Sequence, residues 1–276
     1  MTVRSWLELA KQRVSSLDAD LILLMVLQGQ DRSSLTLHSE RVLEQAEREM
    51  ATRMLEMRLR HVPMAYIIGW KSFYGLEFMV NSDVLIPRPE TEDLVDLVLM
   101  KQPDRVLEVG TGSGCVAVAI SVASKSEIKV VASDISQKAL KVARKNAKYH
   151  SAKIKFIQSD LLQKFDEIPE MVVANLPYVN PLWEWVSPEL KYEPARALFT
   201  EDNGLFLIKR LMGEFIEIRD KMSEQGNKKK AYLVLEADLS QHEQIIEYAE
   251  KTWKLKHEES KGLTVMFSYQ PDTLQE

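Results

Sequence analysis

Residues 104–120, DRVLEVGTGSGCVAVAI, decide the fold of this chain of 276 residues. Val106, Leu107 and Val109 are apolar, as expected of a strand that is covered on both faces. Three glycines follow at a spacing of two, and glycine accepts a positive φ and lets the backbone approach a ligand closely. Small and apolar residues complete the stretch and suit a helix that packs on a sheet. The stretch therefore predicts a buried strand, a glycine turn and a helix, the arrangement at which doubly wound α/β folds bind ligands.

The spacing of the glycines indicates the kind of ligand. A dinucleotide site has the pattern G-x-G-x-x-G, with the pyrophosphate at the N-terminus of the helix. Here the pattern is G-x-G-x-G, and Glu108 stands two residues before the first glycine. A carboxylate there is a poor neighbour for phosphate and a good one for a cation or an ammonium group. The spacing and the acid together resemble motif I of the class I S-adenosylmethionine (AdoMet) methyltransferases. A tight strand–helix turn without a ligand is the alternative.

Composition sets broad limits on the class of protein. An apolar content of 45% and a charged content of 28% are ordinary for a soluble globular protein. The net charge of -5 gives no general attraction to nucleic acid or to an anionic membrane. The single cysteine, Cys115, excludes an internal disulfide framework and fits a reducing compartment. The first residues lack a signal-peptide pattern, and the most apolar run, residues 21–27, is too short to span a bilayer. We expect a cytoplasmic monomer with no metal site.

The chain is expected to have three parts. Residues 1–65 read as a helical domain, which includes a long charged helix from Arg41 to Arg60. Residues 66–84 form a linker that contains a β-hairpin around Gly75. Residues 85–276 form the catalytic domain. Its first residues, LIPRPETE at 85–92, hold two prolines that stiffen the backbone, and Thr91 is placed to cap the helix that follows.

After the glycine turn, strands alternate with helices. Strands are predicted at 129–135, 154–161, 171–175, 231–236 and 262–269, and helices at 137–150, 204–222 and 240–252. Such alternation predicts an α/β fold with a mainly parallel sheet covered by helices on both faces.

Two of these strands end in an acid. Asp134 could accept hydrogen bonds from the ribose hydroxyls of a nucleoside bound at the switch point of the sheet, although it could also cap the next helix. Asp160 could accept from an adenine amino group, and Leu161 could pack on the ring. With Glu108, these acids form a set that suits an adenosine with an amino-acid tail.

The strand at 171–175 ends in Asn175, Leu176, Pro177 and Tyr178, which resembles the N-P-P-Y signature of methyltransferases that act on amide or exocyclic amino nitrogen. The lone pair of such a nitrogen is delocalised. Two acceptors, the side-chain oxygen of Asn175 and the carbonyl of Leu176, could orient it toward the methyl group, and Tyr178 could stack on the planar amide. Leu176 replaces the usual proline but keeps the carbonyl, and Pro177 still favours extended geometry at residue 176.

With these motifs in place, nearly the whole chain resembles the HemK/PrmC family, protein-(glutamine-N5) methyltransferases of peptide-chain release factors. The stretch at 85–92 is the most family-specific piece, and Tyr192-Glu193-Pro194 also matches. The resemblance implies a class I, Rossmann-like, seven-stranded methyltransferase domain, a helical substrate-recognition domain and a hairpin connector. It implies AdoMet contacts from the set Glu108, Gly110, Thr111, Gly112, Ser113, Gly114, Asp134, Ile135, Asp160, Leu161 and Asn175. Contacts with the glutamine of a Gly-Gly-Gln loop are implied for the set Asn175, Leu176, Pro177, Tyr178, Arg88 and Glu90, of which Asn175, Pro177 and Tyr178 are the catalytic residues.

Three other functions remain open. The same Asn-x-Pro-Tyr chemistry would serve N-methylation of a base in rRNA or DNA, although the acidic balance and the lack of a concentrated basic patch disfavour it. An inactive AdoMet-binding scaffold would explain Leu176 but not the retained Asn175, Pro177 and Tyr178. An NAD-dependent oxidoreductase is disfavoured by the glycine spacing and by Glu108.

Overall fold

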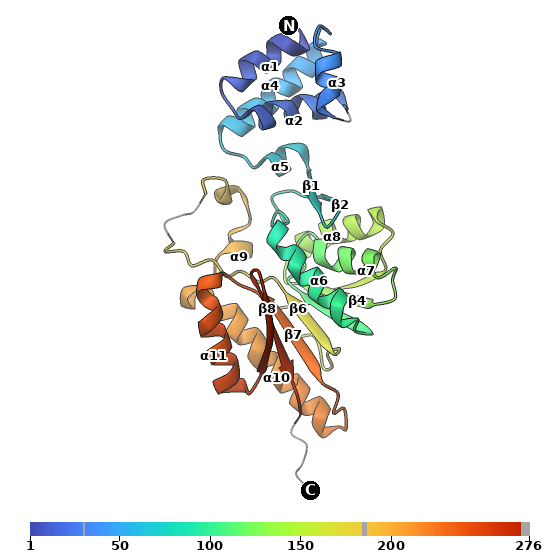
Figure 1. Cartoon of the computed structure of the whole chain (residues 1–276), viewed down its shortest axis with the longest axis vertical. Coiled ribbons are helices and arrows are strands. Elements are labelled where there is room, and N and C mark those ends of the chain that lie inside the picture. Colours follow the sequence, from blue (N-terminus) through green and yellow to red (C-terminus); the bar gives the residue numbers. More distant parts are fainter. Residues whose placement is uncertain (30, 184–186, 272–276) are drawn as a thin grey trace. The chain divides into compact units, whose positions relative to one another are not determined.

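The computed structural model describes residues 1–29, 31–183 and 187–271. The chain divides into two compact units, one made of Met1–Trp70 and Ser187–Tyr192, the other of Lys71–Val186 and Glu193–Glu276 (Figure 1). None of the helices in the described part combines the length and apolar character that crossing a bilayer requires.

The first unit is built from short capped helices. They are α1 (Val3–Lys11), α2 (Ser16–Leu27), α3 (Arg32–Leu37), α4 (Gln45–Leu59) and α5 (Met64–Ile68), with the 3₁₀ turn η2 (Leu190–Tyr192) from the later segment. Trp6, Ile22, Leu23 and Leu55 lie in its buried core. The expected helix from Arg41 to Arg60 was placed too early at its start. The capping box formed by Glu44 and Glu47 starts α4 only at Gln45, because it satisfies free N–H groups of the first turn.

A β-hairpin opens the second unit, as the sequence predicted. Strands β1 (Trp70–Phe73) and β2 (Leu76–Met79) flank Tyr74 and Gly75, which have φ values of 51° and 70°. Positive φ at both turn residues matches the right-handed twist of hairpin strands. Asn146 binds the end of the hairpin, because its side chain accepts from the Met79 N–H at 2.8 Å and donates to the Met79 carbonyl at 3.0 Å.

The second unit contains the seven-stranded, mainly parallel sheet that was expected, in the order β5-β4-β3-β6-β7-β9-β8. The strands are β3 (Arg105–Val109), β4 (Lys129–Asp134), β5 (Ile154–Gln158), β6 (Met171–Ala174), β7 (Ala231–Glu236), β8 (Lys256–Lys261) and β9 (Thr264–Tyr269). Only the pairs that β9 makes with β7 and β8 are antiparallel. Strand β8 was not predicted from its own residues, because KHEESK lacks an apolar alternation. Its charges and its irregularity between His257 and Glu259 are typical of an edge strand.

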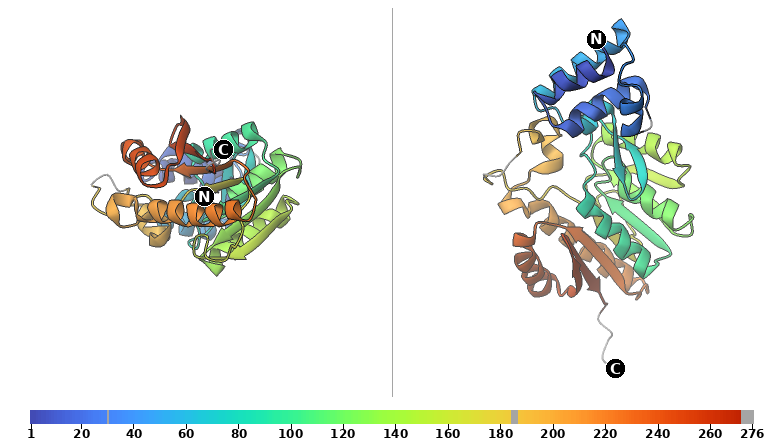
Figure 2. Two further views of the ribbon diagram at one scale, coloured as in Figure 1. Left: turned by 90° about the horizontal axis from the view of Figure 1, so that it is seen from below. Right: turned by 45° about the horizontal axis from the view of Figure 1, so that its top comes forward.

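Helices cover both faces of the sheet (Figure 2). The helices of this unit are α6 (Glu92–Lys101), α7 (Cys115–Ala123), α8 (Gln137–Tyr149), α9 (Ala195–Leu198), α10 (Phe206–Glu224) and α11 (His242–Trp253), with 3₁₀ turns η1 (Pro89–Thr91), η3 (Asp202–Gly204) and η4 (Leu239–Gln241). Leu107 and Val109 of β3 pack in one buried cluster with α10 and α11, and Val106 packs in the other with α6 and α7. The parallel pairing brings the carboxyl ends of β3, β4, β5 and β6 to one edge of the sheet.

Candidate functional site

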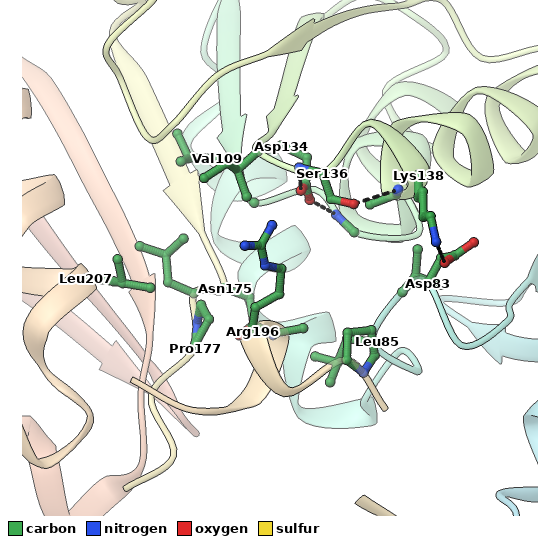
Figure 3. Close-up of a pocket in the computed structure, with 18 of the residues that line it drawn as sticks. Asp83, Leu85, Val109, Asp134, Ser136, Lys138, Asn175, Pro177, Arg196 and Leu207 are labelled. Atoms are coloured by element: carbon green, nitrogen blue, oxygen red, sulfur yellow. Dashed lines mark hydrogen bonds and ion pairs between the residues drawn. The ribbon is translucent and has the colours of Figure 1, made fainter. Parts of the chain in front are cut away.

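A cavity of about 520 Å³ lies at this edge (Figure 3). This is the place where open α/β sheets bind ligands, because the strand order reverses beside β3. The following residues line it: Ser82, Asp83, Val84, Leu85, Val109, Gly110, Gly112, Asp134, Ile135, Ser136, Lys138, Ala139, Ser159, Asp160, Leu161, Asn175, Leu176, Pro177, Pro194, Arg196, Ala197, Phe199 and Leu207. The structure thus brings together most residues of the predicted cofactor and amide sites.

The three glycines of the turn have different surroundings. Gly110 and Gly112 line the cavity, whereas Gly114 does not. Gly114 has a φ of 82°, and a Cβ there would lie 3.0 Å from the Cβ of Ala143 on α8. The third glycine therefore permits close packing of the turn on a neighbouring helix.

Gly114→Ala is expected to destabilise the second unit by about 1–2 kcal/mol, because a left-handed conformation is costly for an L-residue. The close contact with Ala143 adds to this cost. Denaturant unfolding of Gly114→Ala and of the control Gly226→Ala would measure it. Gly226 also has a positive φ, but a Cβ there would meet nothing within 4 Å. Equal losses in the two variants would contradict the packing explanation.

Glu108 lies beneath the turn, with 4% of its surface exposed. Its carboxyl group accepts from the Thr111 hydroxyl at 2.5 Å and from the Ala117 N–H at 3.1 Å, in the first turn of α7. Burial raises the pKa of Glu108 to about 8. Glu108, Thr111 and Ser113 are all buried and do not line the cavity. The geometry gives them a role in holding the turn.

Asp134 ends β4 and does line the cavity. Its carboxylate accepts from the Gly112 N–H at 2.9 Å and from the Ser136 N–H at 2.8 Å. The N-cap of α8 is Ser136, whose hydroxyl oxygen accepts from the Ala139 N–H, so the alternative role of Asp134 as that cap is wrong. Burial raises the pKa of Asp134, while the two N–H groups and the nearby charge of Arg196 oppose the rise. Ile135, half exposed, lines the cavity beside it.

Asp160 and Leu161 lie on the same wall, after β5. Asp160 pairs with Arg210 of α10 at 3.0 Å. Leu161 is buried and has a φ of 43°. A carboxylate beside an apolar side chain could bind an amino-substituted ring.

The segment after β6 joins the cavity to a buried polar network. Asn175, Leu176 and Pro177 line the cavity. The Asn175 side-chain NH₂ donates to the Thr91 hydroxyl oxygen at 3.0 Å. The Tyr178 hydroxyl donates to Glu236 at 3.1 Å and does not line the cavity.

Several contacts hold the backbone of Tyr178. The Gln241 side chain donates to its carbonyl at 2.9 Å and to the Asn203 carbonyl at 2.8 Å. A Cβ at Gly204 would lie 2.0 Å from the Tyr178 carbonyl oxygen, so only glycine fits at that position. These contacts therefore hold the segment after β6, residues 175–178, on the side of the Tyr178 carbonyl.

The family-specific stretch at 85–92 mainly supports the site. Arg88 pairs with the buried Glu193 at 2.5 Å, and the Ile86 N–H donates to the same carboxylate at 2.9 Å. These contacts connect the two motifs at 85–92 and 192–194. Arg88 and Glu90 do not line the cavity.

Sequence reasoning missed three residues near the cavity. Thr91 is the N-cap residue of α6, as expected, but its side chain makes no capping hydrogen bond, and its hydroxyl oxygen instead accepts from Asn175. Arg196 extends from α9 into the cavity toward Asp134 (Figure 3). Glu236 contacts Tyr178 from β7. The signal for Arg196 was its place two residues after the Tyr192-Glu193-Pro194 motif. Within residues 1–29, 31–183 and 187–271, no three His, Cys, Asp or Glu side chains are grouped to hold a metal.

Known proteins match both units. Residues 3–69 match the family described as PrmC N-terminal domain, and residues 90–201 match the methyltransferase small domain. A release factor glutamine methyltransferase of Lactococcus lactis is 37% identical over 67% of this chain and 69% of that protein. A protein of the same name from Bacillus cereus is 31% identical over 83% of this chain and 82% of its own length. The release factor glutamine methyltransferase of Bacillus subtilis is 38% identical over 73% of this chain and 74% of its own length.

A solved structure supports the fold. The catalytic domain of hMettl16, in complex with MAT2A 3'UTR hairpin 1, superposes with a TM-score of 0.51 at 15% identity. The match covers 82% of this chain and 81% of that chain, and at this identity it bears on the fold alone. On the sequence matches, the chain belongs to the family of release factor glutamine methyltransferases.

Proposed function

We propose that this enzyme transfers a methyl group from AdoMet to the side-chain amide nitrogen (N5) of the glutamine in the Gly-Gly-Gln loop of a peptide-chain release factor. The observation that carries the proposal is the position of Asn175, Leu176 and Pro177 on the wall of the cavity that Asp134 and the glycine turn also line. One ligand in this cavity would meet both an adenosine-type site and an amide-type site.

The residues of the cavity fit AdoMet. Its volume of about 520 Å³ lies in the usual range for small-molecule sites. Asp134 keeps lone pairs for ribose hydroxyls beyond the two N–H groups that it accepts from. Asp160 and Leu161 provide an acceptor and an apolar surface for a purine. Bound AdoMet would supply a methyl group on a sulfonium centre that needs no further activation.

The protein would then promote the reaction mainly by positioning the substrate amide. The Asn175 side-chain oxygen and the Leu176 carbonyl would accept the two hydrogens of the glutamine amide and so direct its nitrogen lone pair toward the methyl group. The same two oxygens would offset the positive charge that develops on nitrogen. Pro177 favours extended geometry at Leu176, and Tyr178 would stack on the amide. No general base is needed before transfer, because the product nitrogen becomes acidic.

The names of the relatives support a release factor as the substrate. We assign substrate recognition to the helical domain of residues 1–65, because residues 3–69 match the PrmC N-terminal domain. The enzyme would act in the cytoplasm, where release factors meet ribosomes.

Labelled AdoMet, a purified release factor and its Gly-Gly-Gln→Gly-Gly-Ala variant test the proposal. We expect label on the first protein and none on the second. Label on rRNA or DNA instead would favour base methylation. If AdoMet binds but neither protein nor nucleic acid is labelled, the chain is an AdoMet-binding scaffold.

A further inference from the structure

A buried carboxyl group lies behind the amide-binding segment. Strands β6 and β7 pair in parallel with Ala174 opposite Leu235, so Asn175 and Glu236 are the next residues on adjacent strands. Glu236 is 1% exposed and does not line the cavity. The Tyr178 hydroxyl donates to its Oε1 at 3.1 Å. The group is thus placed to act on Asn175 and Tyr178 rather than on a ligand.

Thr91 connects Glu236 to Asn175. Its hydroxyl oxygen accepts from the Asn175 NH₂ at 3.0 Å, and the residue is 3% exposed. The hydroxyl hydrogen of Thr91 is then free to turn to Glu236. Hydrogen bonding from Thr91 lowers the pKa of Glu236, against the larger effect of burial, so the two side chains interact. Asn175 also hydrogen-bonds to Glu236, so the donors run in one direction, from the Asn175 NH₂ to the carboxylate, both directly and by way of Thr91.

This direction decides which end of the Asn175 carboxamide faces the cavity. The oxygen and the NH₂ of a carboxamide are nearly equal in shape, so packing alone does not select between two orientations related by a flip. An ionised carboxylate can only accept hydrogen bonds. It therefore requires Thr91 to donate to it, and Thr91 in turn accepts from the NH₂ of Asn175. The Oδ1 atom of Asn175 is left available to a substrate N–H.

We propose that Glu236 is a positioning residue that keeps Asn175 Oδ1 turned to the substrate amide and holds the Tyr178 ring through its hydroxyl. The inference rests on the proposed function for its catalytic consequence. Its structural part, the orientation of one carboxamide, is independent of the substrate.

The inference predicts a pH dependence. Burial raises the pKa of Glu236 to about 7, and the nearby charge of Glu90 acts in the same direction, while hydrogen bonds from Thr91, Tyr178 and Asn175 oppose it. Arg88 and Asp238 also lie near enough to Tyr178 to affect its pKa. Only the ionised form of Glu236, which can accept but not donate hydrogen bonds, keeps the Asn175 NH₂ turned away from the cavity. Hence kcat of the wild-type enzyme should rise as the pH increases through about 7.

Glu236→Gln is the direct test, because it keeps the shape but lets the side chain donate to Thr91. At pH 8 we expect kcat to fall about tenfold through lost orientation, with the Kd for AdoMet unchanged. The rise of kcat near pH 7 should disappear. Thr91→Val should lower kcat similarly, and Thr91→Ser should restore it. Asp220→Asn is the matched control: it removes another carboxylate that accepts from a tyrosine, Tyr269, at 2.7 Å.

A second readout does not depend on turnover. The side-chain amide ¹⁵N resonance of Asn175, identified by its loss in Asn175→Ala, should titrate near pH 7 in the wild type and not in Glu236→Gln. A wild-type kcat and pH profile in Glu236→Gln, or an Asn175 resonance that does not titrate, would overturn the inference. If the wild type methylates no release factor, the proposed function fails, and the resonance still decides the role of Glu236.

Discussion

Asn175→Ala is expected to lower kcat for methyl transfer by roughly 10²–10³-fold, the usual cost of removing one preorganised group that meets developing charge. The substitution removes the side-chain acceptor on the cavity wall and leaves the Leu176 carbonyl as the remaining acceptor in the segment. AdoMet should still bind, because Asp134 and the glycine turn are unchanged. Single-turnover methylation of the release factor, with a separate AdoMet titration, measures the two effects.

Asn227→Ala is a matched control, because it makes the same Asn→Ala change away from the cavity. Asn227 lies in the turn between α10 and β7, where its side chain accepts from the Lys229 N–H at 3.3 Å. We expect this variant to retain the wild-type kcat. Unchanged turnover in Asn175→Ala would remove Asn175 from the mechanism and would also remove the reason for positioning it through Glu236.

The local sequence pattern was enough to predict the parallel part of the sheet. The apolar residues of β3, the glycines after it and the βα alternation follow from burial on both faces and from turn geometry, and each depends on neighbours in the chain. Strand β8 could not be predicted from its local sequence. It is a strand because β9 pairs with it, with Lys261 opposite Thr264, and the residues of KHEESK do not carry that information.

The same distinction holds for the site. Asp134 and Asn175 could be predicted because each ends an apolar strand that is visible in the sequence. The roles of Thr91 and Glu236 could not, because their contacts with Asn175 and Tyr178 join residues 84 and 58 positions apart. The register of β6 and β7 brings Glu236 beside Asn175. Sequence pattern thus predicted the groups that face the cavity better than those that hold them.

Asp134→Ala is expected to raise the Kd for AdoMet by about 5- to 150-fold, or about 1–3 kcal/mol, because a charged acceptor facing the cavity is lost. Isothermal titration of the free enzyme would measure this. The pKa of Asp134 is raised by burial, so lowering the pH should protonate the group and weaken AdoMet binding in the wild type. In Asp134→Ala this part of the pH dependence should be absent.

The substitution also removes the acceptor of the Gly112 and Ser136 N–H groups, so a distorted turn could weaken binding as well. Ser136→Ala tests whether loosening the start of α8 is enough to weaken binding. It removes the N-cap hydrogen bond of α8, at a cost of about 1 kcal/mol in stability, but leaves the carboxylate in place. We expect its Kd for AdoMet to stay within about twofold of the wild type, since a twofold change is only about 0.4 kcal/mol. Equal weakening in both variants would mean that Asp134 serves the turn, and the ribose contact would have to be assigned elsewhere.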